Sequence, residues 1–282
     1  MTNGPAASAS GRSRTLARAL VLLAFPALFF TSPPVLRAGD GDPSSRVLVD
    51  GEDLIYNVRY GFIDLGQIRI TTSNGEVTGA TRTYRGKALI NSYSKVPFVD
   101  LHAVFENVID AGMYSHHFEA RMKEKEAWGF ARYEFDYQRH RVIIDVGSAD
   151  SIIAKSETLQ VDAKENDGLS LFFFARDKLL SGQQFNVPTL IKEQKANSFL
   201  DFRNERTSVE VDAIDYPVDV VHFDGHLDFV GIFGLTGGFE GWFSNDEARV
   251  PIMAKMKVLI GSVTVELMKW NRQGWTPPRG QG

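Results

Sequence analysis

The residues best suited to chemistry lie in a short alternating stretch, His222-Phe-Asp-Gly-His226, followed by Asp228. Histidine nitrogens and carboxylate oxygens are common ligands of divalent transition metals. Side chains two apart on a strand share a face, but those four apart lie about 13 Å from one another, too far to share one ion. A tight turn at Asp224-Gly225 would instead place His222 opposite Leu227. The pattern therefore favours a solvated hairpin tip, and we predict no metal site.

Three carboxylates elsewhere, Asp136, Asp219 and Glu266, offer a different chemistry. Glycoside hydrolysis needs two carboxyl groups about 5–9 Å apart, which residues distant in sequence can supply after folding. The chain holds no G-x-S-x-G, P-loop, G-x-G-x-x-G or H-E-x-x-H motif. We therefore predict a protein that is not an enzyme and has no cofactor, and we keep a carboxylate-dependent hydrolase as an alternative.

The stretch Gly241–Trp270 predicts a strand, a polar turn and a long strand. Asp246 suits the turn, because Asp side chains accept hydrogen bonds from nearby backbone amides. Arg249 follows closely enough to pair with it, so we interpret Asp246 and Arg249 as a structural ion pair of the turn. Apolar residues then alternate from Ile252 to Ile260, which predicts one buried strand face.

One segment departs from strand periodicity. Residues 169–180 place apolar side chains at helical spacing and predict a helix over 167–180, with Asn166 or Asp167 at its start and Gly182 at its end. Its apolar residues lie on more than one side, whereas a helix resting on a sheet needs only one apolar stripe. A second layer, an oligomer contact or a ligand must therefore bury the surplus. The interpretation that we favour is a sheet curled around this helix, and we expect any opening to lie along it.

Aromatic residues are abundant, with 20 Phe, 8 Tyr and 4 Trp. Most of them must form the core, but an incompletely closed sheet would leave some facing an apolar groove. A hydrophobic dye or a fatty acid is the expected type of ligand. The candidate ligand-binding residues are Phe172, Phe173, Phe174, Tyr133, Phe135 and Trp242.

Most of the remaining chain alternates apolar and polar residues with the period of a strand. Asn74-Gly75 is a strong signal for a type I′ hairpin turn, and the glycines from Gly231 to Gly238 predict a loop. We expect a mainly β fold, a large twisted antiparallel sheet or half-open barrel with one packed α-helix. Further strands are predicted at 54–60, 67–72, 80–92, 101–110, 115–126, 128–137, 141–146, 184–191, 198–204, 207–213, 217–223 and 227–233.

The first 38 residues have the pattern of a secretory signal peptide, with arginines, an apolar run at 19–30 and a cleavage site after Ala38. The run of about twelve residues is too short to span a bilayer comfortably. We expect cleavage near Ala38, with an uncleaved anchor as the alternative, and no transmembrane span in the mature chain. Residues 39–50 are predicted to be a flexible leader and the Pro/Gly-rich residues 272–282 a disordered tail.

Charge and cysteine usage exclude several classes. The formal net charge is −4 although the first 38 residues carry four arginines and no acid, so the remaining chain is more acidic still. An acidic surface disfavours non-specific nucleic-acid binding. The 282 residues include no cysteine, which excludes disulfides, thiolate metal sites and lipid attachment to an N-terminal cysteine.

Several motifs together resemble one family of exported bacterial proteins, the DUF3108 proteins. They are Gly51–Gly66 (GEDLIYNVRYGFIDLG), Phe135-Asp136-Tyr137, Ser170–Arg176 (SLFFFAR) with Gly182 and Phe185, Trp242–Pro251 (WFSNDEARVP) and Gly261–Leu267 (GSVTVEL). The likeness covers residues 50–268 in the same order. It implies an exported, periplasmic, β-rich envelope protein with a single DUF3108-like domain over 51–271, and it transfers no catalytic residues.

Our leading hypothesis is an exported cell-envelope protein that binds or carries an apolar or amphiphilic, lipid-like ligand without catalysing a reaction. The first alternative is a glycan-binding or envelope-assembly partner protein, which would use exposed Trp and Tyr faces instead of an enclosed groove. The second alternative is the carboxylate-dependent hydrolase.

Overall fold

The structure, a computed structural model, confirms the mainly β fold. It describes residues 46–78, 81–96, 99–124, 126–148, 152–230, 235–258 and 261–281, which belong to a unit spanning Asp40–Gly282. The predicted signal peptide at 1–38 and residues 39–45 lie outside the described residues.

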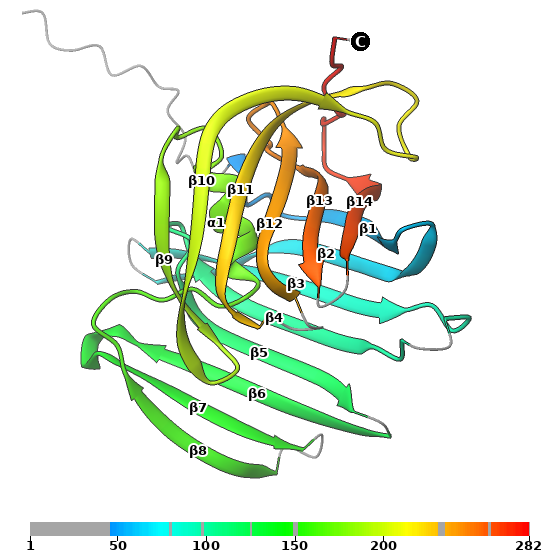
Figure 1. The fold of residues 1–282 in the computed structure, drawn as a ribbon. Coiled ribbons are helices and arrows are strands. Elements are labelled where there is room, and N and C mark those ends of the chain that lie inside the picture. Colours follow the sequence, from blue (N-terminus) through cyan, green and yellow to red (C-terminus); the bar gives the residue numbers. More distant parts are fainter. Residues whose placement is uncertain are drawn as a thin grey trace, which may run out of the picture. The chain divides into compact units, whose positions relative to one another are not determined.

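The described strands form one antiparallel sheet of fourteen strands, in the spatial order β8-β7-β6-β5-β4-β3-β2-β1-β14-β13-β12-β11-β10-β9 (Figure 1). They are β1 (Glu52–Tyr60), β2 (Ile63–Thr78), β3 (Thr81–Ser92), β4 (His102–Asp110), β5 (Ser115–Glu124), β6 (Ala127–Asp136), β7 (Arg141–Ser148), β8 (Ile153–Gln160), β9 (Gln184–Ile191), β10 (Gln194–Val209), β11 (Val218–Val230), β12 (Leu235–Ser244), β13 (Pro251–Val258) and β14 (Ser262–Asn271). A short 3-10 helix, η2 (Tyr137–Arg139), joins β6 to β7.

The first strand lies in the middle of the sheet. β1 pairs with β2 on one side and with β14 on the other. From β1, strands β2–β8 step outward to one edge, and β9–β14 return from the opposite edge. We call β2–β8 the N-terminal wing and β9–β14 the C-terminal wing. The edges are β8 and β9, and the helix α1 (Ser170–Lys178) lies between them in sequence.

A short stretch before the helix connects the two wings. The N–H of Asn166 donates to the carbonyl of Pro188 in β9 (2.9 Å), and the N–H of Leu190 donates to the carbonyl of Asn166 (2.8 Å). On the other side, the N–H of Ser115 at the start of β5 donates to the carbonyl of Glu165 (3.3 Å). The wings therefore meet through Glu165 and Asn166, beside the start of the helix.

Helix α1 is shorter than the predicted 167–180 and begins beside a buried carboxylate. Asp167 Oδ1 accepts hydrogen bonds from the N–H groups of Leu169 (2.6 Å) and Ser170 (2.8 Å). Its other oxygen accepts from the Ser115 hydroxyl (2.5 Å). Burial raises the pKa of Asp167, although these donors favour its charged form. The helix stops before Gly182, whose φ of 66° is a left-handed conformation that glycine adopts freely.

The helix lies behind β10–β12 in Figure 1 and is covered by aromatic side chains of the C-terminal wing. Rings from α1, β9, β10, β11 and β12 contact one another in series, with neighbouring centroids 4.9–5.9 Å apart; they are Phe174, Phe185, Phe202, Phe223 and Phe243. The curled sheet thus buries more than one side of the helix, as its apolar pattern predicts. Within the described residues, no helix has the length and apolar character needed to cross a membrane.

The predicted turn at Asn74-Gly75 is wrong, because both residues lie inside β2. A register irregularity follows Asn74, and its N–H donates to the carboxylate of Asp50 (2.9 Å). A Cβ atom at Gly75 would lie 2.9 Å from the backbone of Thr83. Glycine is therefore needed here because two strands approach each other closely. A hairpin turn would also favour glycine, so the sequence does not distinguish the two cases.

Strand lengths in the C-terminal wing also differ from the prediction. β10 and β11 are continuous where the sequence predicts two strands each, and Asp224-Gly225 lies within β11. The predicted long strand after the Asp246 turn is divided into β13 and β14. Gly261, with φ of 79°, supplies the left-handed residue next to that break.

Both predicted flexible segments contain residues with defined contacts. In the leader, Val47 and Leu48 are buried in the core. In the tail, the N–H of Gly280 donates to the carbonyl of Pro217 (2.8 Å), and the guanidinium of Arg279 lies 3.9 Å from the centre of a Tyr ring in the loop before β11. Composition alone predicts disorder for such segments. It does not show which individual side chains form contacts with the rest of the chain.

Candidate functional site

A half-open cavity of about 280 Å³ lies between one side of α1 and the inner face of the sheet. The helix contributes Leu171, Phe172 and Ala175, and Gly168 precedes them. The sheet contributes residues from both sides of the β1–β14 junction. The lining residues on the sheet are Tyr56, Ile68, Ile70, Ser198, Leu200, Phe223, Leu227, Phe239, Glu240, Gly241, Phe243, Pro251, Met253, Ala254, Met256 and Val265.

Two glycines shape the wall formed by β11 and β12. Phe223 stands opposite Gly241, and Gly225 stands opposite Phe239. A Cβ atom at Gly225 would overlap the Phe239 ring, and one at Gly241 would overlap the Phe223 ring. Each ring therefore lies flat over the glycine of the neighbouring strand, so the wall is aromatic without filling the cavity.

The polar groups at the cavity wall are few and poorly suited to catalysis. The Tyr56 hydroxyl is buried and has no hydrogen-bond partner among the described residues, and burial raises its pKa. The Ser198 hydroxyl forms a hydrogen bond with the Thr189 hydroxyl (3.1 Å). The Glu240 carboxylate faces His222 on the other side of the strand (3.9 Å). The arrangement suits an apolar ligand, because the remaining wall offers only hydrocarbon and aromatic surface.

A buried ion pair connects β1 to the helix. Arg176 donates to both carboxylate oxygens of Glu52, at 2.7 and 2.9 Å, and both side chains are essentially inaccessible to solvent. Arg272 donates to the same carboxylate from the end of β14. Burial alone would raise the pKa of Glu52, but the two guanidinium groups outweigh it and hold the pKa below the usual value. Arg176 also donates to the carbonyl of Ala248 (3.0 Å).

The turn before β13 differs from the predicted ion pair. Asp246 Oδ1 accepts from the backbone N–H groups of Ala248 and Arg249, both at 3.0 Å, so it stabilises the turn through the backbone. The Arg249 guanidinium instead donates to the carbonyls of Arg176 (3.2 Å) and Asp177 (2.7 Å) at the end of α1. Arg249 thus caps the helix C-terminus, where a positive charge is favoured.

The structure brings one of the six predicted ligand-binding residues, Phe172, to the cavity. Phe173 and Phe174 are buried on other sides of α1. Tyr133 and Phe135 are buried in β6 of the N-terminal wing. Trp242 alternates with the cavity residues Gly241 and Phe243, so it faces the opposite side of β12 and stacks on His222, with centroids 5.0 Å apart.

The cavity residues that the sequence analysis missed come mostly from the sheet. A signal for them exists in the paired tripeptides Phe223-Asp-Gly225 and Phe239-Glu-Gly241, which the register places against each other. Aromatic residues beside glycines on neighbouring strands indicate rings that cover glycine backbone. Reading that signal requires the pairing of β11 with β12, which sequence alone does not give.

The three carboxylates of the hydrolase alternative have separate partners. Asp136 pairs with Arg139 (2.9 Å) and Arg141 (3.3 Å) beside η2. Asp219 in β11 accepts from the Asn245 amide (2.8 Å). Glu266 lies in β14, on the opposite strand face from the cavity residue Val265. The structure holds these carboxylates in different local networks, none of which belongs to the cavity.

The antiparallel sheet curled around one helix places this chain in the class of β-barrel-like folds. A solved structure of this class, the "Beta-barrel-like Protein of Domain of Unknown Function DUF1849 from Brucella abortus", is similar in fold with a TM-score of 0.51 at 9% identity, over 80% of this chain and 98% of that one. The hypothetical protein CT021 from Chlamydia trachomatis matches with a TM-score of 0.26 at 12% identity, over 86% and 98% of the two chains.

The chain belongs to the DUF3108 family, a "Protein of unknown function" family whose model matches residues 55–268. No curated protein sequence matches the chain. The matched region contains Arg176 and Arg249, so the family region includes both the helix cation of the buried pair and the residue that caps the helix.

Proposed function

We propose that this protein binds an apolar or amphiphilic molecule in the cavity beside α1. The observation that supports the proposal is the composition of the wall, in which aliphatic, aromatic and methionine side chains surround about 280 Å³ of space. That volume is near the lower end of typical ligand pockets, about 300–1,000 Å³. It suits one ring system or a short acyl chain, and the half-open side leaves room for a polar head to stay in water.

The wall can also adapt to its ligand. Met256 contributes a flexible thioether side chain from the same face of β13 as Ala254, and it is only partly buried. Methionine adjusts to ligands of different shape because it is unbranched and polarisable. We therefore expect selection by size and apolarity, with little discrimination by hydrogen bonding.

Ala254 provides the sharpest test of the cavity. Ala254→Phe places a ring in the space that the ligand would occupy, and it should reduce binding of a fluorescent fatty acid at least tenfold. Lys255→Phe adds the same ring one residue later, on the opposite strand face, and is the matched control. Equal binding by both variants, at unchanged melting temperatures, would refute the cavity as the binding site.

We also propose that the protein is exported and acts in the periplasm, because its first 38 residues have the basic and apolar pattern of a signal peptide. N-terminal sequencing of protein recovered from the periplasmic fraction should begin near Gly39. An intact N-terminus on a membrane-bound form would contradict cleavage.

A surface depression of about 390 Å³ favours glycan binding as a second candidate function. It is lined by Trp128 and Phe130 with the charged residues Glu119, Arg121 and Arg132. A half-buried indole beside guanidinium and carboxylate groups is the arrangement on which sugar rings stack. Quenching of Trp128 fluorescence by soluble envelope glycans, lost in Trp128→Ala, would support this function independently of the cavity.

A further inference from the structure

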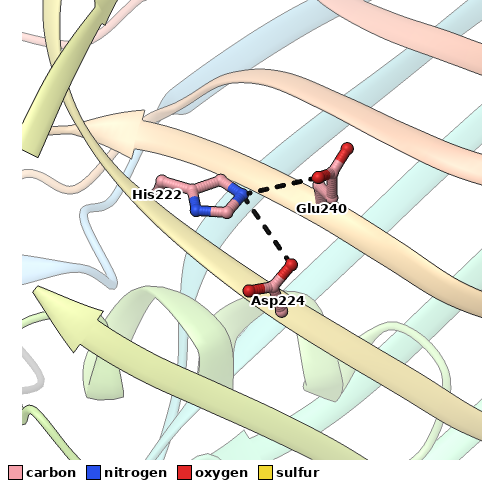
Figure 2. A group of neighbouring side chains, drawn as sticks. All are labelled: His222, Asp224 and Glu240. Carbon is pink, nitrogen blue, oxygen red and sulfur yellow. Dashed lines mark ion pairs between the residues drawn. The ribbon is translucent and has the colours of Figure 1, made fainter. Parts of the chain in front are cut away.

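We propose that His222, Asp224 and Glu240 bind one divalent transition-metal ion of the zinc type (Figure 2). These residues lie on the outer face of β11 and β12, opposite the cavity. One nitrogen and two carboxylate oxygens suit such an ion, with water completing the coordination. The site is separate from the proposed ligand cavity, so either proposal can fail without the other.

Strand register brings the three side chains together. His222 and Asp224 are two residues apart on β11 and share a face, and Glu240 of β12 stands directly opposite Asp224. His222 Nε2 lies 3.9 Å from Asp224 Oδ1 and 3.9 Å from Glu240 Oε1. The three potential ligand atoms all lie within 4.8 Å of one another. The alternating residues of one strand lie too far apart to share an ion when they are four positions apart. Here the third ligand comes from the neighbouring strand, so the distances are short.

The distances require only a small contraction around an ion. Two ligands that bind one zinc ion tetrahedrally lie about 3.4 Å from each other, given bonds of roughly 2.1 Å. The side chains of Asp224 and Glu240 are 41% and 49% exposed, so they are free to rotate inward. His222 is 16% exposed and therefore forms the fixed part of the site.

Two contacts orient the His222 ring as a ligand. Its Nδ1 lies 3.3 Å from Glu205 Oε2 in β10, which leaves Nε2 to face the two carboxylates. Metal-binding histidines commonly donate their other ring N–H to a carboxylate in this way, which fixes the tautomer. Trp242 packs against the ring with centroids 5.0 Å apart.

The neighbouring positive charges leave the ligand atoms available. Arg203 contacts Asp224 at its other oxygen, Oδ2 (3.5 Å), and is held mainly by Asp201 (2.7 Å). Lys255 pairs in register with Glu240, but its Nζ lies over the Trp242 ring, 5.4 Å from the centroid. Four carboxylates lie around the site, against these two cations; they are Asp201, Glu205, Asp224 and Glu240. A divalent cation is therefore electrostatically favoured.

Equilibrium dialysis of the tag-free protein against Zn²⁺ alone, with metal counted by mass spectrometry, tests the site. The absence of cysteine removes thiolate binding as a background. We expect one ion per chain, and a loss of affinity of more than about tenfold in His222→Gln and in Glu240→Gln. Glu205→Gln, which removes the orienting partner, should weaken binding by roughly 10–100-fold.

His226→Gln is the matched control, because His226 lies on the same face of β11 and pairs with its own carboxylate, Asp228 (3.3 Å). It should bind as the wild type does. Ni²⁺ should quench Trp242 fluorescence in the wild type, and Trp242→Phe should lack that quenching. An absence of saturable binding overturns the proposal, as does equal binding by wild type and His222→Gln. Melting curves of these surface variants should overlay without metal, and Asp224→Asn provides an independent ligand variant.

Discussion

Glu52 and Arg176 connect two elements that lie far apart in the sequence. Glu52 begins β1 and Arg176 lies in α1, yet their side chains form a bidentate pair. Removing one partner of such a pair leaves a buried charge without compensation. The pair therefore fixes where α1 meets β1. Its effect on the free energy of unfolding should become measurable when one partner is removed.

Arg176→Ala should lower the free energy of unfolding by about 3–5 kcal/mol, because it leaves the Glu52 carboxylate buried with one cation fewer. Urea denaturation at neutral pH measures this. The control is Arg69→Ala. Arg69 of β2 forms a bidentate pair with Asp53, the residue after Glu52 on β1, but its side chain is 46% exposed. An exposed pair contributes roughly 0–1 kcal/mol. Equal losses would show that burial does not set the contribution.

Asp110 should make stability depend on pH in acid. Burial alone would raise its pKa, but bonds from His116, Lys164 and the Tyr114 N–H lower the pKa from 3.8 to about 2. A carboxyl whose folded pKa is lowered stabilises the protein above its unfolded pKa and loses that contribution as pH falls through its folded pKa. The contribution should therefore disappear between about pH 4 and pH 2.

Asp110→Asn tests this assignment. Its difference in unfolding free energy from the wild type, measured by urea denaturation at a series of pH values, should shrink as pH falls from 4 to 2. The other acidic groups titrate in both proteins and cancel in the difference. A gap that stays constant over that range would show that Asp110 has no lowered pKa.

Among the elements, the helix was predictable and the longest strands of the C-terminal wing were not. Apolar residues at helical spacing leave few alternatives for 169–180, and the structure has α1 within that range. Gly225, by contrast, suggests a turn, whereas its role is to accept the Phe239 ring within a continuous strand. Local sequence does not separate these two uses of glycine, because the ring comes from another strand.

The same limit applies to the candidate sites. Phe172 was predictable as a cavity residue from the surplus of apolar surface on the helix. Glu240 was not predictable as a neighbour of His222, because their contact depends on the register between β11 and β12. A motif confined to one strand shows half of a two-strand site.

The aromatic wall of β11 and β12 predicts a consequence for Gly241. Gly241→Ala should displace the Phe223 ring into the cavity, which reduces fatty-acid binding and costs about 1–3 kcal/mol of stability through overpacking. Gly238→Ala is the control on the same strand, because a Cβ atom there would meet its nearest neighbour at 3.8 Å. If both variants bind the fatty acid equally well, the ring is not held by the glycine.

At the scale of the Asp40–Gly282 unit, the last residues support the centre of the sheet. Trp275 packs on Trp270 of β14, and its indole N–H donates to Asp246 Oδ2 (2.8 Å). Arg272 reaches Glu52 at the start of β1. The tail therefore joins the turn before β13 to the central strands.

A chain that stops at Gly274 should be less stable than the full chain by about 1.5–3 kcal/mol or more, since it loses a hydrogen bond to a charged group and the packing of Trp275. A chain that stops at Gly280 keeps these contacts and should melt like the full chain. Thermal denaturation followed by circular dichroism compares them. Identical melting of the Gly274 and Gly280 chains would show that residues 275–280 contribute nothing to stability.

The position of β1 in the sheet delays its full pairing during folding. Among the described strands β1 is the first in sequence and its neighbour β14 is the last, and Asp53 pairs with Asn271. Until β14 pairs with it, one side of β1 keeps its backbone donors and acceptors unpaired. Such an edge is a template for pairing with other chains, and closing so long a loop is slow. The folding chain therefore depends on β14 to complete the pairing of β1, and until then this edge exposes the chain to aggregation.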